Sequence, residues 1–346
     1  MMIKNSEKGF NVSIILVICL TLVFIFCNVL PVAAAEKTAK LKFAYWMSTK
    51  HSLHPVFEKY ANEVKALTNG RVEITLYPGG ALGGPREQWD MAVGGIADIS
   101  FFMPGYTAGR FPLTSVFDLP LLLGGTSTVN TAIAQPVFEK YLEQEYKDAK
   151  ILFFFVSEPF TFHTSKKQIN SMADVKGLKF RSSGAVQSAM VKGLGGSPVT
   201  LPITEVYTSL EKGVIDGVVT AFTAMVGYRL WDVVKYSINA NLTATPMVVA
   251  MNKKTWDSLP ADVQQILDNL KMRYAFECAT KYDGDVGKSL DIGKSKGNVI
   301  YSLPAAELVK WEAKFAPVYD QWLGDMKAKG LPGKAAVDQI RQLQGK

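Results

Sequence analysis

The sequence predicts an α/β protein made of two lobes. From Leu41 onward, short β-rich runs alternate with longer segments of helical periodicity, which is typical of helices packed around mostly parallel sheets. The chain has 346 residues, a length that suits about two domains after an N-terminal leader is removed. The same order of strands and helices also begins a second time near Leu178, as expected for a second lobe.

The first lobe is predicted from alternation, helix-start and helix-stop signals. Apolar residues alternate with polar ones between Arg71 and Tyr77, which indicates a strand. A helix is expected to begin at Pro55 and to end before Asn69-Gly70, a pair suited to the left-handed conformation. The other expected elements of this lobe are strands over 41–46 and 98–103 and a helix over 86–93.

The second lobe follows the same pattern, and long helices come after it. Beyond Asp257 the sequence is mainly helical, with two stretches, 261–290 and 305–327, that are long enough to brace both lobes. The expected elements of the second lobe are strands over 178–181, 199–201 and 218–220 and helices over 186–194 and 205–212.

One short sequence pattern occurs in both expected lobes. Gly95-Ile96-Ala97-Asp98 and Gly213-Val214-Ile215-Asp216 each follow an amphipathic helix and each lead into a β-rich run. Two related halves would produce this pattern, and so would coincidence at a common helix-to-strand junction. The sequence leaves both explanations open.

The N-terminus has the pattern of a secretory signal. Lys4 and Lys8 precede an apolar run from Val12 to Val29, and the small residues Ala33-Ala34-Ala35 follow. We expect residues 1–35 to be a signal peptide cleaved after Ala35, which places the mature protein in the periplasm. The run is long enough to span a bilayer, so an uncleaved anchor is the alternative.

Charge and cysteine content exclude several classes of protein. The formal net charge is +7, and basic residues alternate with acidic ones along the expected helices, as in Glu58-Lys59, so a nucleic-acid partner is not expected. Cleavage after Ala35 would leave Cys278 as the only cysteine. The fold therefore has no intramolecular disulfide and depends on packing.

Arg181 is the candidate anion-binding residue. It ends an expected strand and is followed by Ser182-Ser183-Gly184 and a helix, so a guanidinium, two hydroxyls and helix N-terminal amides converge. The planar guanidinium favours a carboxylate, because it donates two parallel hydrogen bonds. On spacing alone, a surface salt bridge explains Arg181 equally well.

Aromatic residues lie at or just beyond the expected strand ends, where open α/β sheets place their ligands. They fit an aromatic wall of a binding site, although aromatic residues are also common in cores. These residues are Trp46, Phe101, Phe102, Tyr106 and Phe222.

Catalysis and nucleotide binding find little support. The three histidines are His51, His54 and His163, no Gly-x-Ser-x-Gly motif is present, and Cys278 has no partner nearby in sequence. The glycine-rich stretch 79–84 is not followed by a Lys-Ser or Lys-Thr pair, which excludes a phosphate loop. We expect no enzyme activity, no cofactor and no metal, because His51 and His54 lack further ligands in a cluster.

A composite of four segments resembles the DctP-type solute-binding proteins of tripartite ATP-independent periplasmic (TRAP) transporters. The likeness extends through most of the chain after the leader. The segments are Asp174-Val175-Lys176-Gly177-Leu178-Lys179-Phe180-Arg181, Gly196-Ser197-Pro198-Val199, Glu205-Val206-Tyr207-Thr208-Ser209-Leu210 and Gly213-Val214-Ile215-Asp216-Gly217.

The resemblance implies the class II type of periplasmic-binding-protein fold. Two α/β lobes would be joined by strands and a long hinge-spanning helix, with a ligand cleft that closes between them. Lobe I would cover 36–160 with parts of 247–346, and lobe II 161–246 with part of 285–320. The partners implied are a small organic carboxylate and the small and large TRAP membrane subunits, with the binding protein a monomer.

The resemblance also implies roles for individual residues. Arg181 matches the arginine that clamps the ligand carboxylate. Thr161 stands where better known relatives carry a second arginine, Thr220 where they carry an asparagine, and Ile203 where a phenylalanine is common. We therefore expect a less polar pocket that prefers a monocarboxylate with an apolar or aromatic body. The expected ligand-binding residues are Arg181, Thr161, Thr220, Trp46, Tyr106 and Phe222.

Two other functions stay open at this point. An extracytoplasmic sensor could use the same fold to report a ligand to a signalling receptor. A periplasmic enzyme of α/β fold is disfavoured, because no nucleophile–base pair or metal cluster is visible in the sequence.

Overall fold

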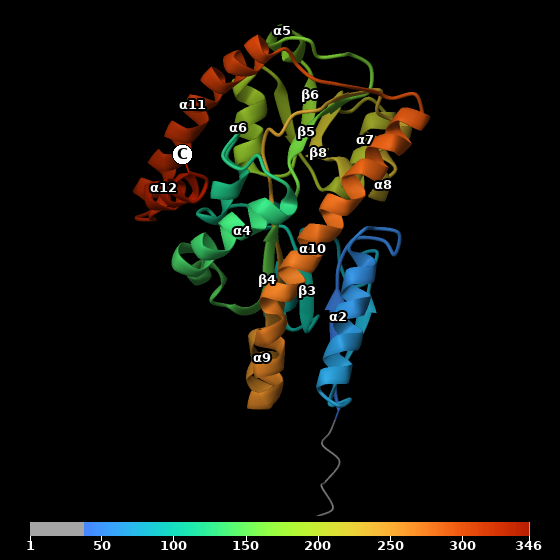
Figure 1. Cartoon of the computed structure of the whole chain (residues 1–346), viewed down its shortest axis with the longest axis vertical. Coiled ribbons are helices and arrows are strands. Elements are labelled where there is room, and N and C mark those ends of the chain that lie inside the picture. The colour runs from blue at the N-terminus through green and yellow to red at the C-terminus, as the bar shows by residue number, and fades with distance from the viewer. Residues whose placement is uncertain (1–37, 346) are drawn as a thin grey trace, which may run out of the picture. The chain divides into compact units, whose positions relative to one another are not determined.

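The computed structural model describes residues 38–345, and residues 39–345 belong to one compact unit built on two mixed sheets (Figure 1). Sheet A has the strand order β2-β1-β3-β10-β4, and sheet B has the order β11-β9-β5-β8-β6-β7. The predicted α/β class is therefore confirmed. The signal peptide expected at residues 1–35 lies outside the described residues.

Strands and helices alternate through most of the described chain. In chain order the strands are β1 (Ala39–Ala44), β2 (Val72–Tyr77), β3 (Ile99–Phe102), β4 (Ala149–Val156), β5 (Phe160–Thr164), β6 (Lys179–Ser182), β7 (Ser197–Thr200), β8 (Gly217–Ala221), β9 (Tyr236–Ile238), β10 (Pro246–Asn252) and β11 (Val299–Tyr301). The α-helices are α2 (His54–Leu67), α3 (Gln88–Gly94), α4 (Ser127–Val137), α5 (Met172–Val175), α6 (Ala185–Gly193), α7 (Val206–Glu211), α8 (Phe222–Gly227), α9 (Lys253–Ser258), α10 (Ala261–Ser295), α11 (Ala305–Ala328) and α12 (Gly333–Leu343). The short helical turns are η1 (Pro104–Tyr106), η2 (Thr114–Asp118), η3 (Phe138–Leu142), η4 (Glu143–Tyr146), η5 (Ile203–Glu205) and η6 (Leu230–Asp232).

Sheet A is mixed rather than mostly parallel. β1 pairs in parallel with β2 and β3, as the strand–helix alternation predicts, but β10 is antiparallel to both β3 and β4. The expectation of mostly parallel sheets is wrong for this part of sheet A. The reason is topological: β10 follows β5 to β9 of sheet B in sequence and returns into sheet A. All seven of its residues are buried.

Sheet B brings the candidate ligand residues to neighbouring strands. β6 is parallel to β7 and β8, and Arg181 lies opposite Val218 in the β6–β8 pair. β5 is antiparallel to β8, and there Thr161 lies opposite Thr220. Parallel strands end at the same edge of a sheet, so β6 and β8 present their last residues to the same space.

The repeated pattern at residues 95–98 and 213–216 has the same local structure in both sheets. Oδ2 of Asp98, just before β3, accepts a 2.9 Å hydrogen bond from the main-chain N–H of Lys42 in β1. Oδ2 of Asp216, just before β8, accepts a 2.8 Å hydrogen bond from the main-chain N–H of Lys179 in β6. In both sheets, therefore, the aspartate joins two neighbouring parallel strands at the point where the second begins.

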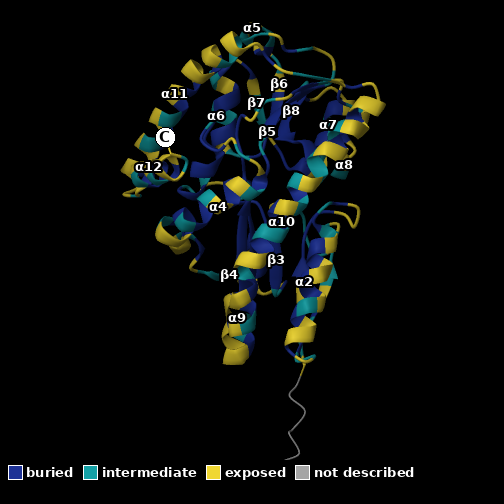
Figure 2. Ribbon diagram, viewed as in Figure 1, coloured by how far each residue is buried: buried dark blue, intermediate teal, exposed yellow. Residues whose placement is uncertain are grey.

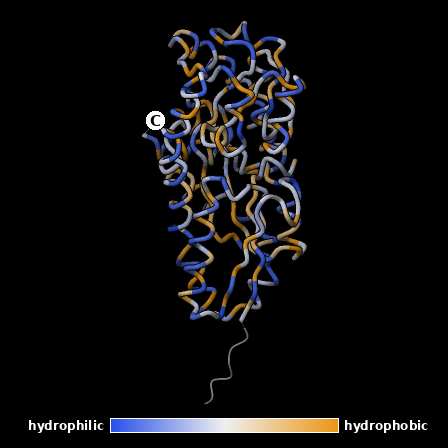
Figure 3. The backbone as a smooth tube through the Cα atoms, turned by 90° about the vertical axis from the view of Figure 1, so that its right-hand side faces the viewer, coloured by the Kyte–Doolittle hydropathy of each residue, from blue (hydrophilic) through white to orange (hydrophobic). Residues whose placement is uncertain are grey.

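The long helix α10 contacts elements of both sheets. It packs against β4 and α2 on the side of sheet A and against α8 and β11 on the side of sheet B (Figure 1). Buried and exposed positions alternate along it (Figure 2), and hydrophobic and hydrophilic stretches alternate along the outer helices (Figure 3). Within residues 38–345, none of the helices combines the length and the apolar character needed to cross a membrane.

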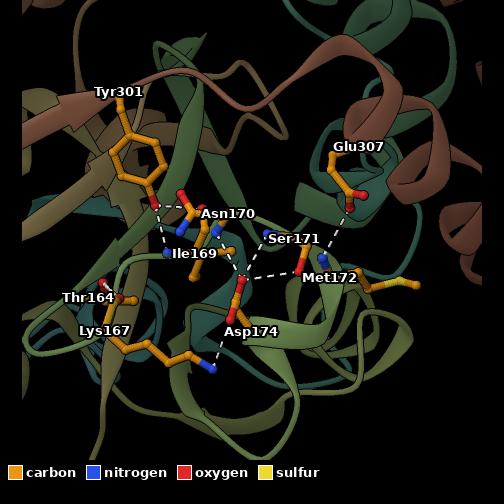
Figure 4. A network of polar contacts seen from close by, with 9 residues as sticks. All are labelled: Thr164, Lys167, Ile169, Asn170, Ser171, Met172, Asp174, Tyr301 and Glu307. Atoms are coloured by element: carbon orange, nitrogen blue, oxygen red, sulfur yellow. Dashed lines mark hydrogen bonds and ion pairs between the residues drawn. The ribbon is translucent and has the colours of Figure 1, made fainter.

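A polar network ties β11 and α11 to residues 167–174, which precede β6 in the chain (Figure 4). The carboxylate of Glu307, in α11, accepts a 3.2 Å hydrogen bond from the main-chain N–H of Met172, in α5. The hydroxyl of Tyr301, in β11, bonds both the N–H and the carbonyl of Ile169. Hydrogen bonding from Lys167 lowers the pKa of Asp174, which keeps that carboxylate charged. These contacts attach α11 to the sheet B side of the molecule.

Candidate ligand-binding site

A cavity lies where residues from both sheets meet. Its volume is about 40 Å³, which is room for about three water molecules. Sheet A and its loops contribute Trp46 and Tyr106, and sheet B contributes Arg181 and Thr220. Most of the remaining lining is apolar or aromatic, with Met47, Phe101, Met103, Phe160, Ile203 and Met247 among its members.

Arg181 is buried and held by three uncharged acceptors. Its side chain is 1% exposed, and Nε donates a 2.8 Å hydrogen bond to the carbonyl of Leu201. Nη1 donates to the carbonyl of Val219 at 3.1 Å, and Nη2 donates to the hydroxyl of Tyr106 at 2.8 Å. A guanidinium has five N–H groups. One N–H on each terminal nitrogen is therefore left for another acceptor, which is the arrangement that a carboxylate accepts bidentately.

No carboxylate within residues 38–345 forms an ion pair with Arg181. A surface salt bridge, the alternative left open by the sequence, is wrong because the guanidinium is buried. A buried charge without a counterion is costly, and a ligand anion removes that cost. The electrostatics of the cavity therefore favour an anionic ligand at Arg181.

Tyr106 offers a further hydrogen-bond donor beside Arg181. Its hydroxyl accepts hydrogen bonds from Nη2 of Arg181 and, at 3.1 Å, from the main-chain N–H of Ile203. Both acceptor positions of the phenolic oxygen are thereby used, so its own proton is free to be donated. The ring stands edge-on to Trp46, with centroids 5.7 Å apart. Tyr106 can thus complete a three-donor site for a carboxylate.

Glu158 also lines the cavity, and the sequence analysis missed it. Its side chain is buried, and Oε1 accepts hydrogen bonds from the N–H and the hydroxyl of Thr223. Oε2 has no partner among the described residues. Burial raises the pKa of Glu158 to about 7. The detectable signal was an acidic residue between the apolar runs that became β4 and β5.

The structure brings four of the six predicted ligand-binding residues to the cavity wall and leaves two behind it. Arg181, Tyr106, Trp46 and Thr220 line the cavity, whereas Thr161 and Phe222 do not.

Thr161 and Phe222 lie close behind the wall. Thr161 is fully buried beside Thr220, and its hydroxyl has no partner among residues 38–345. The ring of Phe222 stacks on Trp231 and stands edge-on to His163, because α8 begins at Phe222 and turns the chain away from β8.

The histidines have structural partners. Nδ1 of His54 lies 2.6 Å from the hydroxyl of Tyr45, and Nδ1 of His51 accepts a hydrogen bond from the N–H of Leu53. Burial lowers the pKa of His51 to about 4, so this cavity-lining ring is neutral. Within the described part of the chain, no group of three His, Cys, Asp or Glu side chains is arranged to hold a metal ion.

An α/β unit whose two sheets share a cavity with a buried arginine, without an ion-pair partner in residues 38–345, has the features of a binding site for a small anionic solute. Residues 43–325 match the family described as bacterial extracellular solute-binding protein, family 7 (DctP). The chain belongs to this family and is a DctP-type TRAP solute-binding protein, as the sequence resemblance predicted. Proteins of this family serve transport.

Solved structures and curated relatives agree with this assignment. A TRAP solute-binding protein from Rhodoferax ferrireducens, in complex with copurified benzoate, has 29% identity and a TM-score of 0.84 over 88% of this chain and 97% of its own. A marine metagenome protein specific for aromatic acids, in complex with 3-hydroxybenzoate, has 29% identity and a TM-score of 0.84 over 89% and 98%. The C4-dicarboxylate-binding periplasmic protein DctP of Rhodobacter capsulatus is 25% identical over 84% of this chain and 89% of its own. These neighbours have the two-lobed fold predicted for this chain.

Proposed function

We propose that this protein captures a small monocarboxylate with an apolar or aromatic body and delivers it to the small and large membrane subunits of a TRAP transporter. The observation that carries the proposal is Arg181, a buried guanidinium with two free N–H groups and no ion-pair partner among the described residues. The ligand carboxylate would supply the missing negative charge.

The charges around the cavity support a ligand with a single carboxylate. Arg181 is the only lysine or arginine among the described residues that line the cavity. Arg110 and Arg229 lie outside that lining, and they pair with Asp148 and Asp232. A second ligand carboxylate would be buried without a cation, which is a cost that selects against dicarboxylates.

The apolar lining supports an aromatic or aliphatic body. Trp46 packs on Phe101 with ring centroids 4.9 Å apart, and Phe160 and Met247 add further apolar surface. The relatives that bind benzoate and 3-hydroxybenzoate have the same fold as this chain, and the Rhodobacter relative, named for C4-dicarboxylates, shows that the family also accepts two charges.

A panel of acids tests the ligand class. Benzoate, phenylacetate and branched aliphatic monocarboxylates are compared with succinate, malate, fumarate and sialic acid, first by melting shift and then by calorimetry, because a ligand of the native state raises apparent stability. We expect the tightest ligand to be a monocarboxylate. A dicarboxylate or sialic acid that binds more tightly than every monocarboxylate would overturn the ligand class and leave the family assignment intact.

The periplasmic location rests on the proposed signal peptide. The lysine-flanked apolar run and Ala33-Ala34-Ala35 favour cleavage after Ala35, so the mature chain should begin at Glu36. Intact-mass measurement on the periplasmic fraction checks this. A full-length chain that alkali does not release from membranes would favour the anchor instead.

A further inference from the structure

We propose that Glu158 is a second ligand anchor, which hydrogen-bonds a hydroxyl or carbonyl oxygen on the body of the bound monocarboxylate. The inference rests on the proposed function, since it assumes that a carboxylate occupies the Arg181 end of the cavity. It narrows the ligand class to hydroxy or oxo monocarboxylates.

The position of the Glu158 carboxyl group is set by the residues around it. Glu158 lies in the short loop between β4 of sheet A and β5 of sheet B, lines the cavity and is 3% exposed. Thr223, in α8, donates both its N–H and its hydroxyl to Oε1. These two bonds fix the rotation of the carboxyl group and leave Oε2 without a partner in the described chain. A buried polar atom without a partner, on a side chain that lines a cavity, is a position where a ligand group gains most.

The charge of Glu158 depends on what fills the cavity. No ion pair within residues 38–345 involves Glu158. Burial raises the pKa of Glu158, and the negative charge of Asp283 raises it further. A ligand carboxylate at Arg181 neutralises the cation of the cavity, so an ionised Glu158 would be a buried anion without compensation. The neutral acid is therefore the form that suits the complex.

The hydrogen bonds from Thr223 decide which oxygen of the neutral Glu158 acid carries the proton. Oε1 accepts two hydrogen bonds from Thr223 and so acts as the carbonyl oxygen. The proton then lies on Oε2, which becomes a buried O–H donor without a partner among residues 38–345, on a side chain that lines the cavity. A ligand hydroxyl or carbonyl oxygen accepts this hydrogen bond, whereas a methyl group of the same size leaves the O–H unsatisfied. A second carboxylate would also bring unwanted charge near Glu158.

Matched ligands test this in the wild-type protein without any substitution. The affinities of 2-, 3- and 4-hydroxybenzoate and of mandelate are measured by calorimetry against the corresponding methylbenzoates and 2-phenylpropanoate. We expect the best hydroxylated acid to bind about tenfold more tightly than its methyl counterpart, a difference of about 1.4 kcal/mol. Equal or tighter binding of every methyl analogue overturns the proposal.

Two substitutions assign the preference to Glu158. Glu158→Met removes the donor, so the hydroxyl preference should fall to within about threefold. Glu158→Gln keeps an oxygen for Thr223 and turns an N–H donor toward the cavity, so it should retain most of the preference. Each variant is its own reference, because two ligands are compared on the same protein.

Asp118 provides a matched control. Among the described residues it is a second buried carboxyl group whose pKa burial raises to about 7, but Thr245 bonds its Oδ1 and it does not line this cavity. Asp118→Asn should leave the hydroxyl preference unchanged. A preference that persists in Glu158→Met, or one that disappears equally in Asp118→Asn, overturns the role of Glu158.

Different results would refute the Glu158 anchor and the proposed capture of a monocarboxylate. If the acids bind but Glu158→Met leaves the ratio unchanged, only the second anchor is wrong. If no acid of the panel binds, or if all bind equally well to Arg181→Ala, the proposed function fails and the anchor fails with it. Should Glu158→Met not fold, the wild-type ligand pairs and Glu158→Gln still decide the matter.

Discussion

The hydroxyl of Tyr106 accepts a 2.8 Å hydrogen bond from Nη2 of Arg181, and this bond connects the two sheets. Tyr106 belongs to the turn η1 that follows β3 in sheet A, whereas Arg181 lies in β6 of sheet B. The guanidinium is therefore oriented by a residue of the opposite sheet. The orientation of the carboxylate site therefore depends on how sheets A and B are packed against each other.

Arg181→Ala should weaken binding of the cognate acid far more than it weakens folding. Removal of one partner of a buried, charge-assisted pair costs about 2 to 5 kcal/mol of binding free energy. Arg181→Lys should also bind weakly, because an ammonium cannot reproduce the bidentate geometry. Calorimetry gives the affinities, and melting temperature reports the fold.

Arg110→Ala is the control for loss of positive charge. Arg110 pairs with Asp148 outside the cavity lining, so its removal should leave the affinity unchanged. An Arg181→Ala protein that binds within threefold of wild type would refute the clamp.

Tyr106→Phe should reduce affinity by about tenfold, because a net hydrogen bond of about 1 kcal/mol or more is lost together with the acceptor for Arg181. The ring contact with Trp46 is kept, so the fold should persist. Tyr146→Phe is a suitable control, because the Tyr146 hydroxyl bonds Thr114 and does not line the cavity. Equal effects of the two substitutions would show that Tyr106 has no special role.

Gly184→Ala should weaken binding through a steric clash between the two halves. A Cβ at Gly184 would lie 3.3 Å from Cα of Gly105, which is tighter than ordinary contact, so η1 and the start of α6 would have to separate. The extended backbone of Gly184 tolerates alanine, so the effect is not strain. Small-angle scattering with saturating ligand should show a less compact particle than wild type.

Gly287→Ala serves as the control for this glycine substitution. A Cβ there meets no atom within 4 Å, and the residue lies inside α10. We expect higher stability by about 0.5 to 1 kcal/mol and unchanged affinity. Reduced affinity in Gly287→Ala would indicate that rigidity of α10, rather than the Gly105 contact, controls closure.

His163 should make the fold less stable in mild acid. Burial lowers the pKa of His163 from 6.5 to about 4, so the unfolded chain binds a proton at a higher pH than the folded chain does. The stability from the neutral ring is complete above pH 6.5 and is lost as the pH falls toward 4, by about 3 kcal/mol in total. Its ring bonds Ser237 and the carbonyl of Thr220.

His163→Gln isolates this contribution. Asp118 and Glu158 have raised pKa values and His51 has a lowered one, so several groups contribute to the pH profile of either protein. The difference between the variant and wild type should therefore be measured by urea unfolding at pH 7 and pH 4.5. We expect a smaller loss of stability for His163→Gln at the lower pH. Parallel profiles for the two proteins would contradict the prediction.

Local pattern predicted many of the regular elements. The alternation at Val72–Tyr77 and the stop signal at Asn69-Gly70 correspond to β2 and to the end of α2, because both depend on neighbouring residues. The helix expected over 261–290 continues to Ser295. β4, β5 and β10 were not assigned, since a continuous apolar run such as Ile151–Val156 has no distinguishing periodicity.

By itself, the sequence determined the α/β class, the DctP-type TRAP family and the choice of Arg181 as the candidate clamp, because these depend on local periodicity and on a specific succession of residue types. Tertiary structure decided which side chains share the cavity. It placed Tyr106 on Arg181 and left Thr161 and Phe222 outside the lining, and it put Glu158 at the wall with one oxygen unpaired. The physical reason is that burial and hydrogen-bond satisfaction depend on contacts between segments far apart in the chain, which local pattern does not encode.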